Sequence, residues 1–213
     1  MATVVPLQTQ HILLEGVGWQ TYQSLIKDLE ADSGKRLTYN QGTLEIMVPL
    51  PPHEGYKKLI GRFVEAATEE TATEIRSLGS TTWSRKDLAK GLEADECYYI
   101  QNEPLVRGKQ EIDLDEDPPP DLAIEINHTS SSIDRLAIYA ALRVPEVWRY
   151  DGARFTILTL QGEQYAAQAT SQVLPTINQV DLARFLDMSQ TMGETSLIRA
   201  FRQWFRTRLE AES

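Results

Sequence analysis

Cysteine is nearly absent from the sequence, with Cys97 as the single example among 213 residues. One cysteine excludes an internal disulfide framework and a zinc site made of paired cysteines, and it favours a reducing compartment. Long apolar runs are absent as well, and residues 1–18 lack the basic start and apolar core of a secretion signal. We therefore expect a protein that makes no contact with membranes and acts in the cytoplasm.

Several functional motifs are also missing. The sequence contains no glycine-rich phosphate loop and no nucleophile-elbow motif, which excludes the common NTPase and serine hydrolase classes. Positive charge is scarce, because 21 lysine and arginine residues face 31 aspartate and glutamate residues and leave a net charge of -10. The molecule as a whole should repel a phosphate backbone, so any binding of nucleic acid must be local or assisted by a metal ion.

The composition is that of an ordinary globular protein, with 41% hydrophobic and 24% charged residues. A chain of this length usually forms one hydrophobic core. We therefore expect one domain over residues 1–213, with its core at about 36–168 and a helical extension at about 178–210.

Hydrophobic periodicity predicts the order of the elements, and their bounds are as follows. No regular structure is expected for residues 1–18, and polar connections are expected at 86–92 and 101–117. The expected helices are 22–32, 53–72, 132–143, 180–186 and 197–209, and the expected strands are 36–39, 43–48, 75–84, 96–101, 121–127, 146–151, 155–160 and 164–168. The fold class is therefore α/β, with an α-β-β-β-α-β core and a mixed sheet. A helix and a hairpin precede this core, and a hairpin and helices follow it.

One stretch near the middle of the chain carries an unusual acid. Three prolines at 118–120 precede Leu122–Ile126, an apolar run that is short and β-branched enough for a buried strand. Ser130 to Ser132 supply an N-cap for the helix that follows, so strand, helix and strand should form a parallel pair. Glu125 lies inside the apolar run, where a charged carboxylate must be paired, bound to a metal or shifted in its pKa.

A second acid, Asp95, lies at the mouth of the preceding predicted strand. Carboxylates on neighbouring strands can share a divalent cation, because Mg²⁺ in proteins is typically held by one or two carboxylates and by phosphate oxygens of a substrate. Such a metal neutralises a phosphodiester and helps to ionise an attacking water. We therefore expect Asp95 and Glu125 to form a site for Mg²⁺ or Mn²⁺.

Several short motifs occur in an order that resembles a known family. They are Gly42-Thr43-Leu44-Glu45-Ile46-Met47, His53, Ala94-Asp95 to Ile100, Pro120-Asp121-Leu122-Ala123-Ile124-Glu125 and Val144-Pro145-Glu146-Val147-Trp148. The pattern resembles the bacterial Uma-two (Uma2) family of restriction-endonuclease-like proteins with the PD-(D/E)xK fold, over roughly residues 20–190. The resemblance implies metal-dependent cleavage of nucleic acid, with DNA as the expected substrate. It also implies a homodimer, because many proteins of this fold cut two strands with two sites.

The resemblance assigns roles to individual residues. Asp95 and Glu125 would be the metal-binding pair, and Asp121 would be an additional acid close to the same strand. Two positions depart from the family pattern. Asn127 stands where a lysine is expected, and Arg135 stands on the following helix, to which that lysine has moved in many relatives. An arginine can hold a phosphate or stabilise negative charge, but it stays protonated and cannot act as a base.

Plainer roles compete with several of these assignments. Glu125 fits an ordinary salt bridge with Arg135 as its partner, and Asp121 fits a cap at the strand entrance as well as it fits a metal ligand. His53 heads a helix after two prolines, where capping or packing is expected rather than metal binding.

The first helix of the wider fold often donates a further acid, for which Glu54 and Glu65 are the candidates. Two functions stay open from the sequence. The first is a metal-dependent nuclease, which the pairing of Asp95 with Glu125 favours. The second is a catalytically impaired copy of the same fold that acts as a binding or structural module, which Asn127 and the negative charge favour.

Overall fold

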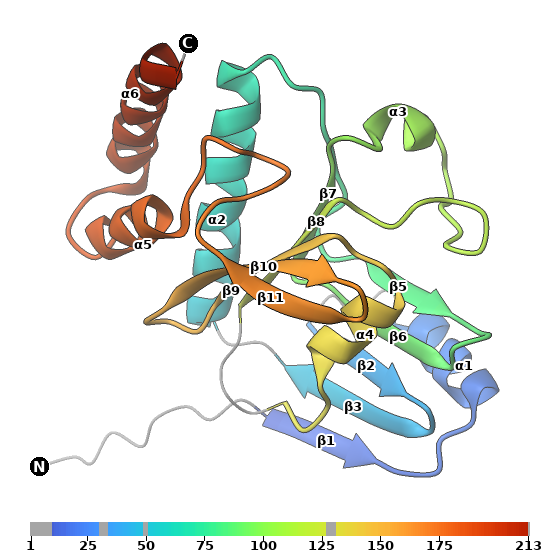
Figure 1. The fold of residues 1–213 in the computed structure, drawn as a ribbon. Coiled ribbons are helices and arrows are strands. Elements are labelled where there is room, and N and C mark those ends of the chain that lie inside the picture. The colour runs from blue at the N-terminus through green and yellow to red at the C-terminus, as the bar shows by residue number, and fades with distance from the viewer. Residues whose placement is uncertain (1–9, 30–33, 49–50, 127–130, 213) are drawn as a thin grey trace, which may run out of the picture.

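Two β-sheets and the helices that cover them make up the fold (Figure 1). The computed structural model describes residues 10–29, 34–48, 51–126 and 131–212. The predicted mixed α/β class is confirmed. None of the helices in these residues combines the length and the apolar character that crossing a bilayer requires.

The first sheet is antiparallel and has the spatial order β1-β3-β2-β6-β5. Its strands are β1 (Gln10–Leu14), β2 (Arg36–Asn40), β3 (Thr43–Val48), β5 (Thr82–Arg85) and β6 (Lys90–Glu93). The predicted hairpin of β2 and β3 is confirmed, and Gln41 and Gly42 in its turn both have the positive φ that a two-residue hairpin loop favours.

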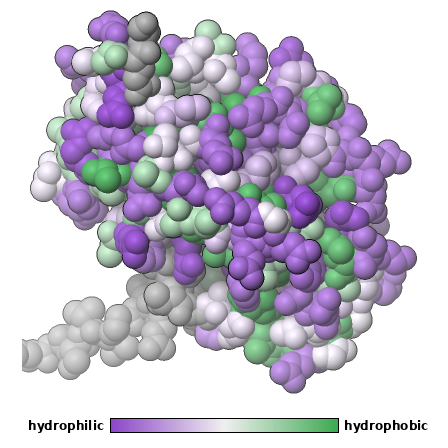
Figure 2. Space-filling model, viewed as in Figure 1, coloured by the Kyte–Doolittle hydropathy of each residue, from purple (hydrophilic) through white to green (hydrophobic). Residues whose placement is uncertain are grey.

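The expectation that residues 1–18 lack regular structure is wrong for β1. This strand pairs with β3 along its whole length and forms one edge of the first sheet. Its apolar residues Ile12, Leu13 and Leu14 are consecutive and all exposed, so the alternation that identifies a half-buried strand is missing. On the face drawn in Figure 2, hydrophobic side chains gather at the lower edge of a mostly hydrophilic surface, over this sheet.

Helix α1 (Trp19–Leu29) covers one face of the first sheet. Tyr22 is fully buried and stacks on Tyr39, with ring centroids 4.6 Å apart. The close approach depends on Gly91 of β6, because a Cβ atom there would lie 2.3 Å from the Tyr22 hydroxyl and 2.7 Å from the Ser84 Cβ.

The second sheet is mixed and has the order β11-β10-β9-β8-β7-β4. Its strands are β4 (Arg76–Ser77), β7 (Glu96–Tyr99), β8 (Leu122–Ile126), β9 (Glu146–Tyr150), β10 (Phe155–Gln161) and β11 (Gln164–Gln168). Strands β8 and β9 are parallel and are joined by helix α4 (Arg135–Ala141), as the sequence predicts, and the other pairs are antiparallel. The predicted serine N-cap is wrong, because Asp134 accepts the hydrogen bond that starts α4.

The prediction of one strand at 75–84 is wrong, because two short strands in different sheets occupy this range. Strand β4 pairs with β7, whereas β5 forms a hairpin with β6, and Gly79 has a positive φ between them. Most of β6 lies in the range expected to be a polar connection. The β5–β6 hairpin is thus an insertion that joins the first sheet. Without it, α2, β4, β7, β8, α4 and β9 keep the predicted α-β-β-β-α-β order.

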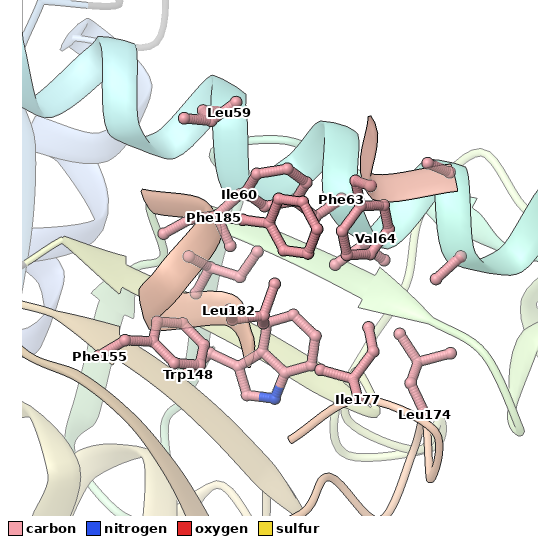
Figure 3. Close-up of a cluster of buried hydrophobic side chains, with 14 of the residues drawn as sticks. Leu59, Ile60, Phe63, Val64, Trp148, Phe155, Leu174, Ile177, Leu182 and Phe185 are labelled. Atoms are coloured by element: carbon pink, nitrogen blue, oxygen red, sulfur yellow. The ribbon is translucent and has the colours of Figure 1, made fainter. Parts of the chain in front are cut away.

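The larger hydrophobic core lies between the second sheet and three helices, α2 (Pro51–Glu70), α5 (Gln179–Met188) and α6 (Glu194–Glu212). Figure 3 shows Ile60 and Phe63 of α2 facing Phe185 of α5 and Trp148 of the sheet. A smaller core on the opposite face of the sheet contains residues of α4 and the short helix α3 (Glu103–Val106). The two faces of the second sheet are therefore both covered by helices.

Replacing Gly91 with alanine should destabilise the protein, because the added methyl group displaces Tyr22 from the first sheet. We expect the free energy of unfolding to fall by about 1–3 kcal/mol, as for other overpacked sites. Gly55 is the matched control, because it lies on the exposed side of α2 with no atom near its Cβ position. Gly55→Ala should raise the same free energy by about 0.5–1 kcal/mol. Urea denaturation measures both, and equal effects would contradict the packing role of Gly91.

Candidate functional site

The two acids singled out in the sequence lie beside each other on neighbouring strands. Strands β7 and β8 are antiparallel with Glu96 opposite Ile124, so one further step along both strands brings Asp95 next to Glu125. Both side chains are buried, at 2% and 6% exposure. The Ile126 backbone N–H donates a 2.8 Å hydrogen bond to Asp95 Oδ2, which fixes one acid against the strand that carries the other.

Glu125 is held by side chains of α4. The Arg135 guanidinium donates two hydrogen bonds to it, from Nε to Oε2 at 2.7 Å and from Nη2 to Oε1 at 2.6 Å. The Tyr139 hydroxyl donates a third to Oε1. Arg135 and Tyr139 are four residues apart and therefore share one face of the helix. The salt bridge that the sequence offered as the plainer role of Glu125 is thus present.

Arg135 also connects the two sheets. Its Nη1 donates to the Thr38 hydroxyl of β2, and its Nη2 donates to the Glu93 carbonyl oxygen at the end of β6, at 2.8 Å. Burial alone would lower the pKa of Arg135, but the charge and hydrogen bonds of Glu125 raise it above its ordinary value. The guanidinium therefore stays charged, and it cannot act as a base.

Asp95 has its own cationic neighbours. His53 Nε2 of α2 lies 3.1 Å from Asp95 Oδ2, and Arg36 Nε of β2 lies 3.8 Å from Oδ1. Burial would raise the pKa of Asp95, but the hydrogen bond and charge of His53 and the charge of Arg135 lower it below its ordinary value. Burial would lower the pKa of His53, and the hydrogen bond to Asp95 raises it instead. The aspartate is therefore ionised at neutral pH.

His53 and Arg36 are site residues whose roles the sequence did not reveal. His53 was expected to cap or pack, yet it contacts Asp95. The available signal was its place on the buried stripe of α2, seven residues before the buried Ile60. Arg36 and Thr38 alternate along β2 and are both buried, which marks an inward polar face of that strand.

Of the two candidate acids on α2, Glu54 lies in this cluster. Its carboxylate lies 3.4 Å from Arg36 Nη2 and 2.7 Å from Lys57 Nζ. Glu65 instead acts on Glu96 and Tyr98 of β7, whose pKa values are raised by burial and, in addition, by the charge of Glu65. Of the two candidates, Glu54 is therefore the one that contacts a neighbour of Asp95, namely Arg36.

The expected metal role of Asp121 is not supported. Its Oδ2 accepts hydrogen bonds from the backbone N–H groups of Ile100 at 2.6 Å and Asn102 at 2.9 Å, and its Oδ1 accepts one from Asn102 Nδ2 at 2.7 Å. It therefore caps the turn after β7. Four extended residues, or about 13 Å, also separate it from Glu125. Asn127, the other departure from the family pattern, lies outside the described residues.

A third buried acid, Glu45 of β3, closes the site from the first sheet. Its carboxylate accepts hydrogen bonds from the Ser131 hydroxyl at 2.7 Å and from the Ser132 backbone N–H at 2.8 Å. Ser131 and Ser132, which were expected to help cap α4, are therefore tied to the other sheet. A cavity of about 160 Å³ is lined by residues of this segment and reaches Glu125 and Arg135.

The carboxylates of Asp95 and Glu125 are the type of ligand that Mg²⁺ prefers. This ion typically binds one or two protein carboxylates, and water and phosphate oxygens fill its other coordination positions. Asp95 Oδ1 lies 3.8 Å from Arg36 Nε. Glu125 is different, because both of its oxygens already accept hydrogen bonds from Arg135. No cluster of three or more histidine, cysteine, aspartate or glutamate side chains suited to a metal occurs in the described part of the chain. Two carboxylates are thus the available ligands, and Arg135 competes for one of them.

A protein-family model matches residues 19–190, from the first residue of α1 to just beyond α5. The family is described as "Uma2: Putative restriction endonuclease". The chain belongs to the Uma2 family. This membership confirms the resemblance seen in the sequence and the restriction-endonuclease-like fold, and it associates the chain with a nuclease-like function. A search of curated proteins finds no significant match. Within this Uma2 chain, β1 and α6 lie outside the matched range.

Changing Asp121 to asparagine separates its capping role from a metal role. We expect the free energy of unfolding to fall by about 1–3 kcal/mol, because an amide cannot accept all the hydrogen bonds that the buried carboxylate accepts. Titration calorimetry with Mn²⁺ should give the same affinity for the variant and the wild type. A weaker affinity for the variant would return Asp121 to the set of metal ligands.

Proposed function

We propose that this Uma2 protein is a cytoplasmic, metal-dependent nuclease that hydrolyses phosphodiester bonds in nucleic acid, with DNA as its first candidate substrate. The observation that supports the proposal best is the pairing of two buried carboxylates, Asp95 and Glu125, across neighbouring strands of a restriction-endonuclease-like sheet. Under this proposal the two acids hold Mg²⁺ or Mn²⁺. The ion would neutralise charge on the phosphodiester and lower the pKa of a bound water.

The neighbouring side chains have separate tasks in this proposal. The Ile126 N–H and His53 hold Asp95 in one orientation through its Oδ2. Arg135 is the group that must move, because it covers both oxygens of Glu125. A phosphate is a strong alternative partner for a guanidinium, so an incoming strand could draw Arg135 away from Glu125.

A second candidate is the catalytically impaired module. The specific observation in its favour is the same Glu125–Arg135 contact, in which two short hydrogen bonds satisfy the acid within the protein. Removal of one partner from a buried charge pair of this geometry strongly destabilises the protein, because the other charge is left unpaired. The pair therefore resists opening. If Arg135 never leaves Glu125, the pair acts as a structural tie and the fold can bind nucleic acid without cutting it.

Metal binding distinguishes the two candidates. For the nuclease, we expect wild-type protein to bind Mn²⁺ in titration calorimetry, and we expect Asp95→Asn and Glu125→Gln each to abolish the binding. Single- and double-stranded DNA and RNA substrates incubated with Mg²⁺ or Mn²⁺ should be cut by the wild type alone. Absence of both binding and cleavage would leave the module as the function.

Arg135→Lys tests whether the guanidinium competes with the metal. Lysine carries a point charge on a flexible chain, so it cannot cover both oxygens of Glu125 as the planar fork does. We expect Arg135→Lys to bind Mn²⁺ more tightly than the wild type. Tyr139→Phe is the control, because it loosens Glu125 by one hydrogen bond and leaves the guanidinium in place. An equal or larger gain in the Tyr139 variant would contradict the competition.

Many proteins of this fold cut two strands with two sites, one in each chain, so the proposal includes a homodimer. Light scattering coupled to gel filtration measures the mass directly. A monomer that still cuts single strands would leave the metal-dependent reaction in place and remove the dimer from the proposal.

A further inference from the structure

A second cavity, of about 630 Å³, lies beside the candidate site. It is bounded by the end of α1, the start of β2, the first turns of α2 and the segment before β5. Its volume is within the range of about 300–1,000 Å³ that is usual for small-molecule sites. No part of the function proposed so far uses it.

The cavity is locally basic in an acidic protein. Lys35, Arg36 and Lys57 line it, together with two acids, Glu54 and Glu93. The whole chain carries a net charge of -10, so an excess of cations over acids is unusual for its surface. The cavity also lies next to the N-terminal part of α2, where the helix dipole favours a bound anion. Charge therefore favours a ligand with a negative group.

Two cations of the cavity, Lys57 and Arg36, are held in fixed positions. Lys57 Nζ lies 2.7 Å from Glu54 Oε2 and 3.3 Å from the Ser80 hydroxyl, and its side chain is 16% exposed. Arg36 Nη1 lies 2.9 Å from Glu93 Oε1, and its Nη2 donates to the same Ser80 hydroxyl at 2.9 Å. A site whose donors are already positioned loses little conformational entropy when a ligand binds.

The lining of the cavity also includes apolar side chains, from Ile26 and Leu29 of α1 and from Leu37 of β2. A lining that combines basic and aliphatic side chains matches a ligand that joins a phosphate to a flat, largely apolar ring. A nucleotide has this chemistry.

Two side chains that line the cavity, Arg36 and Ser80, also contact Asp95 of the candidate site. Arg36 lines the cavity, and its Nε lies 3.8 Å from Asp95 Oδ1. The Ser80 hydroxyl also donates to the Asp95 backbone carbonyl at 3.0 Å. A strand that has one phosphate at Asp95 can therefore place the next nucleotide in the cavity.

We propose that this cavity binds one nucleotide of the nucleic-acid strand adjacent to the cleaved bond. Its phosphate lies against Lys35 and Lys57, and its sugar and base lie against the aliphatic side chains of Ile26, Leu29 and Leu37. The inference rests on the proposed nuclease function for the identity of the strand. It does not depend on a bound metal, so it can be tested separately.

The test measures binding without cleavage. A fluorescently labelled single-stranded DNA oligonucleotide is titrated with the full chain in EDTA, and its anisotropy is followed. We expect Lys57→Gln and Lys35→Gln each to weaken binding severalfold. Each should also reduce the slope of log K against log salt by about 0.7, the value for one lost phosphate contact on a single strand.

Lys58→Gln is the matched control, because Lys58 follows Lys57 on α2, is exposed and does not line the cavity. It removes the same charge from the same helix, and binding should be unchanged. Equal losses in the Lys57 and Lys58 variants, or no loss in either cavity variant, would overturn the proposal. So would absence of binding by the wild type. Lys35 lies just before β2 and Lys57 lies on α2, so a folding defect in one variant leaves the other as a test.

Competition with deoxythymidine monophosphate distinguishes the source of the nucleotide. Displacement of the oligonucleotide by the free nucleotide, weakened by Lys57→Gln, supports a site for a single nucleotide. Binding of the oligonucleotide alone supports a site for a continuous strand. If the protein cleaves nucleic acid with metal but the Lys57 and Lys58 variants bind the oligonucleotide equally, the cavity proposal is wrong and the nuclease proposal stands. If the Lys57 variant loses binding, the Lys58 variant does not, and the wild type cleaves no substrate, the cavity proposal stands and the nuclease proposal is wrong.

Discussion

The buried ion pair of Glu125 and Arg135 is the interaction on which the arrangement of the site depends. The pair joins β8 of the second sheet to helix α4. The same guanidinium donates hydrogen bonds to β2 and to the end of β6 in the first sheet. Removal of one partner from such a pair typically costs about 3–5 kcal/mol, because the other charge is left buried and unpaired. The pair thus specifies how the two sheets meet, even though an apolar replacement of both partners could be equally stable.

Much of the fold was predictable because its central elements have clear periodicity. The stripe of α2 and the short apolar run of β8 identified a helix and a buried strand, and both are present. The predictions fail where pairing between strands, rather than the local pattern of residues, determines the structure. Strand β1 has no alternation, and β5 and β6 contain polar residues and a glycine that are ordered only by their neighbours in the first sheet.

The site was predictable only in part, for a related reason. Asp95 and Glu125 could be paired from the strand order, since that order determines which strand ends are adjacent. The groups around them come from distant parts of the chain. Arg36 belongs to a hairpin that precedes the core, and Glu45 contacts Ser131 across 86 residues. Contacts of this kind depend on how the two sheets pack together, which no local pattern of residues records.

The larger core has a consequence for how the protein is made. The apolar stripe of α2 is covered by residues 174–205, which the ribosome adds much later than α2 itself. At about 5–20 residues per second, the interval is on the order of ten seconds. During that time the nascent chain presents Ile60, Phe63 and Val64 without their cover. Completion of this core therefore waits for residues 174–205, and until they are added the unfinished chain exposes an apolar helix of the kind that chaperones recognise.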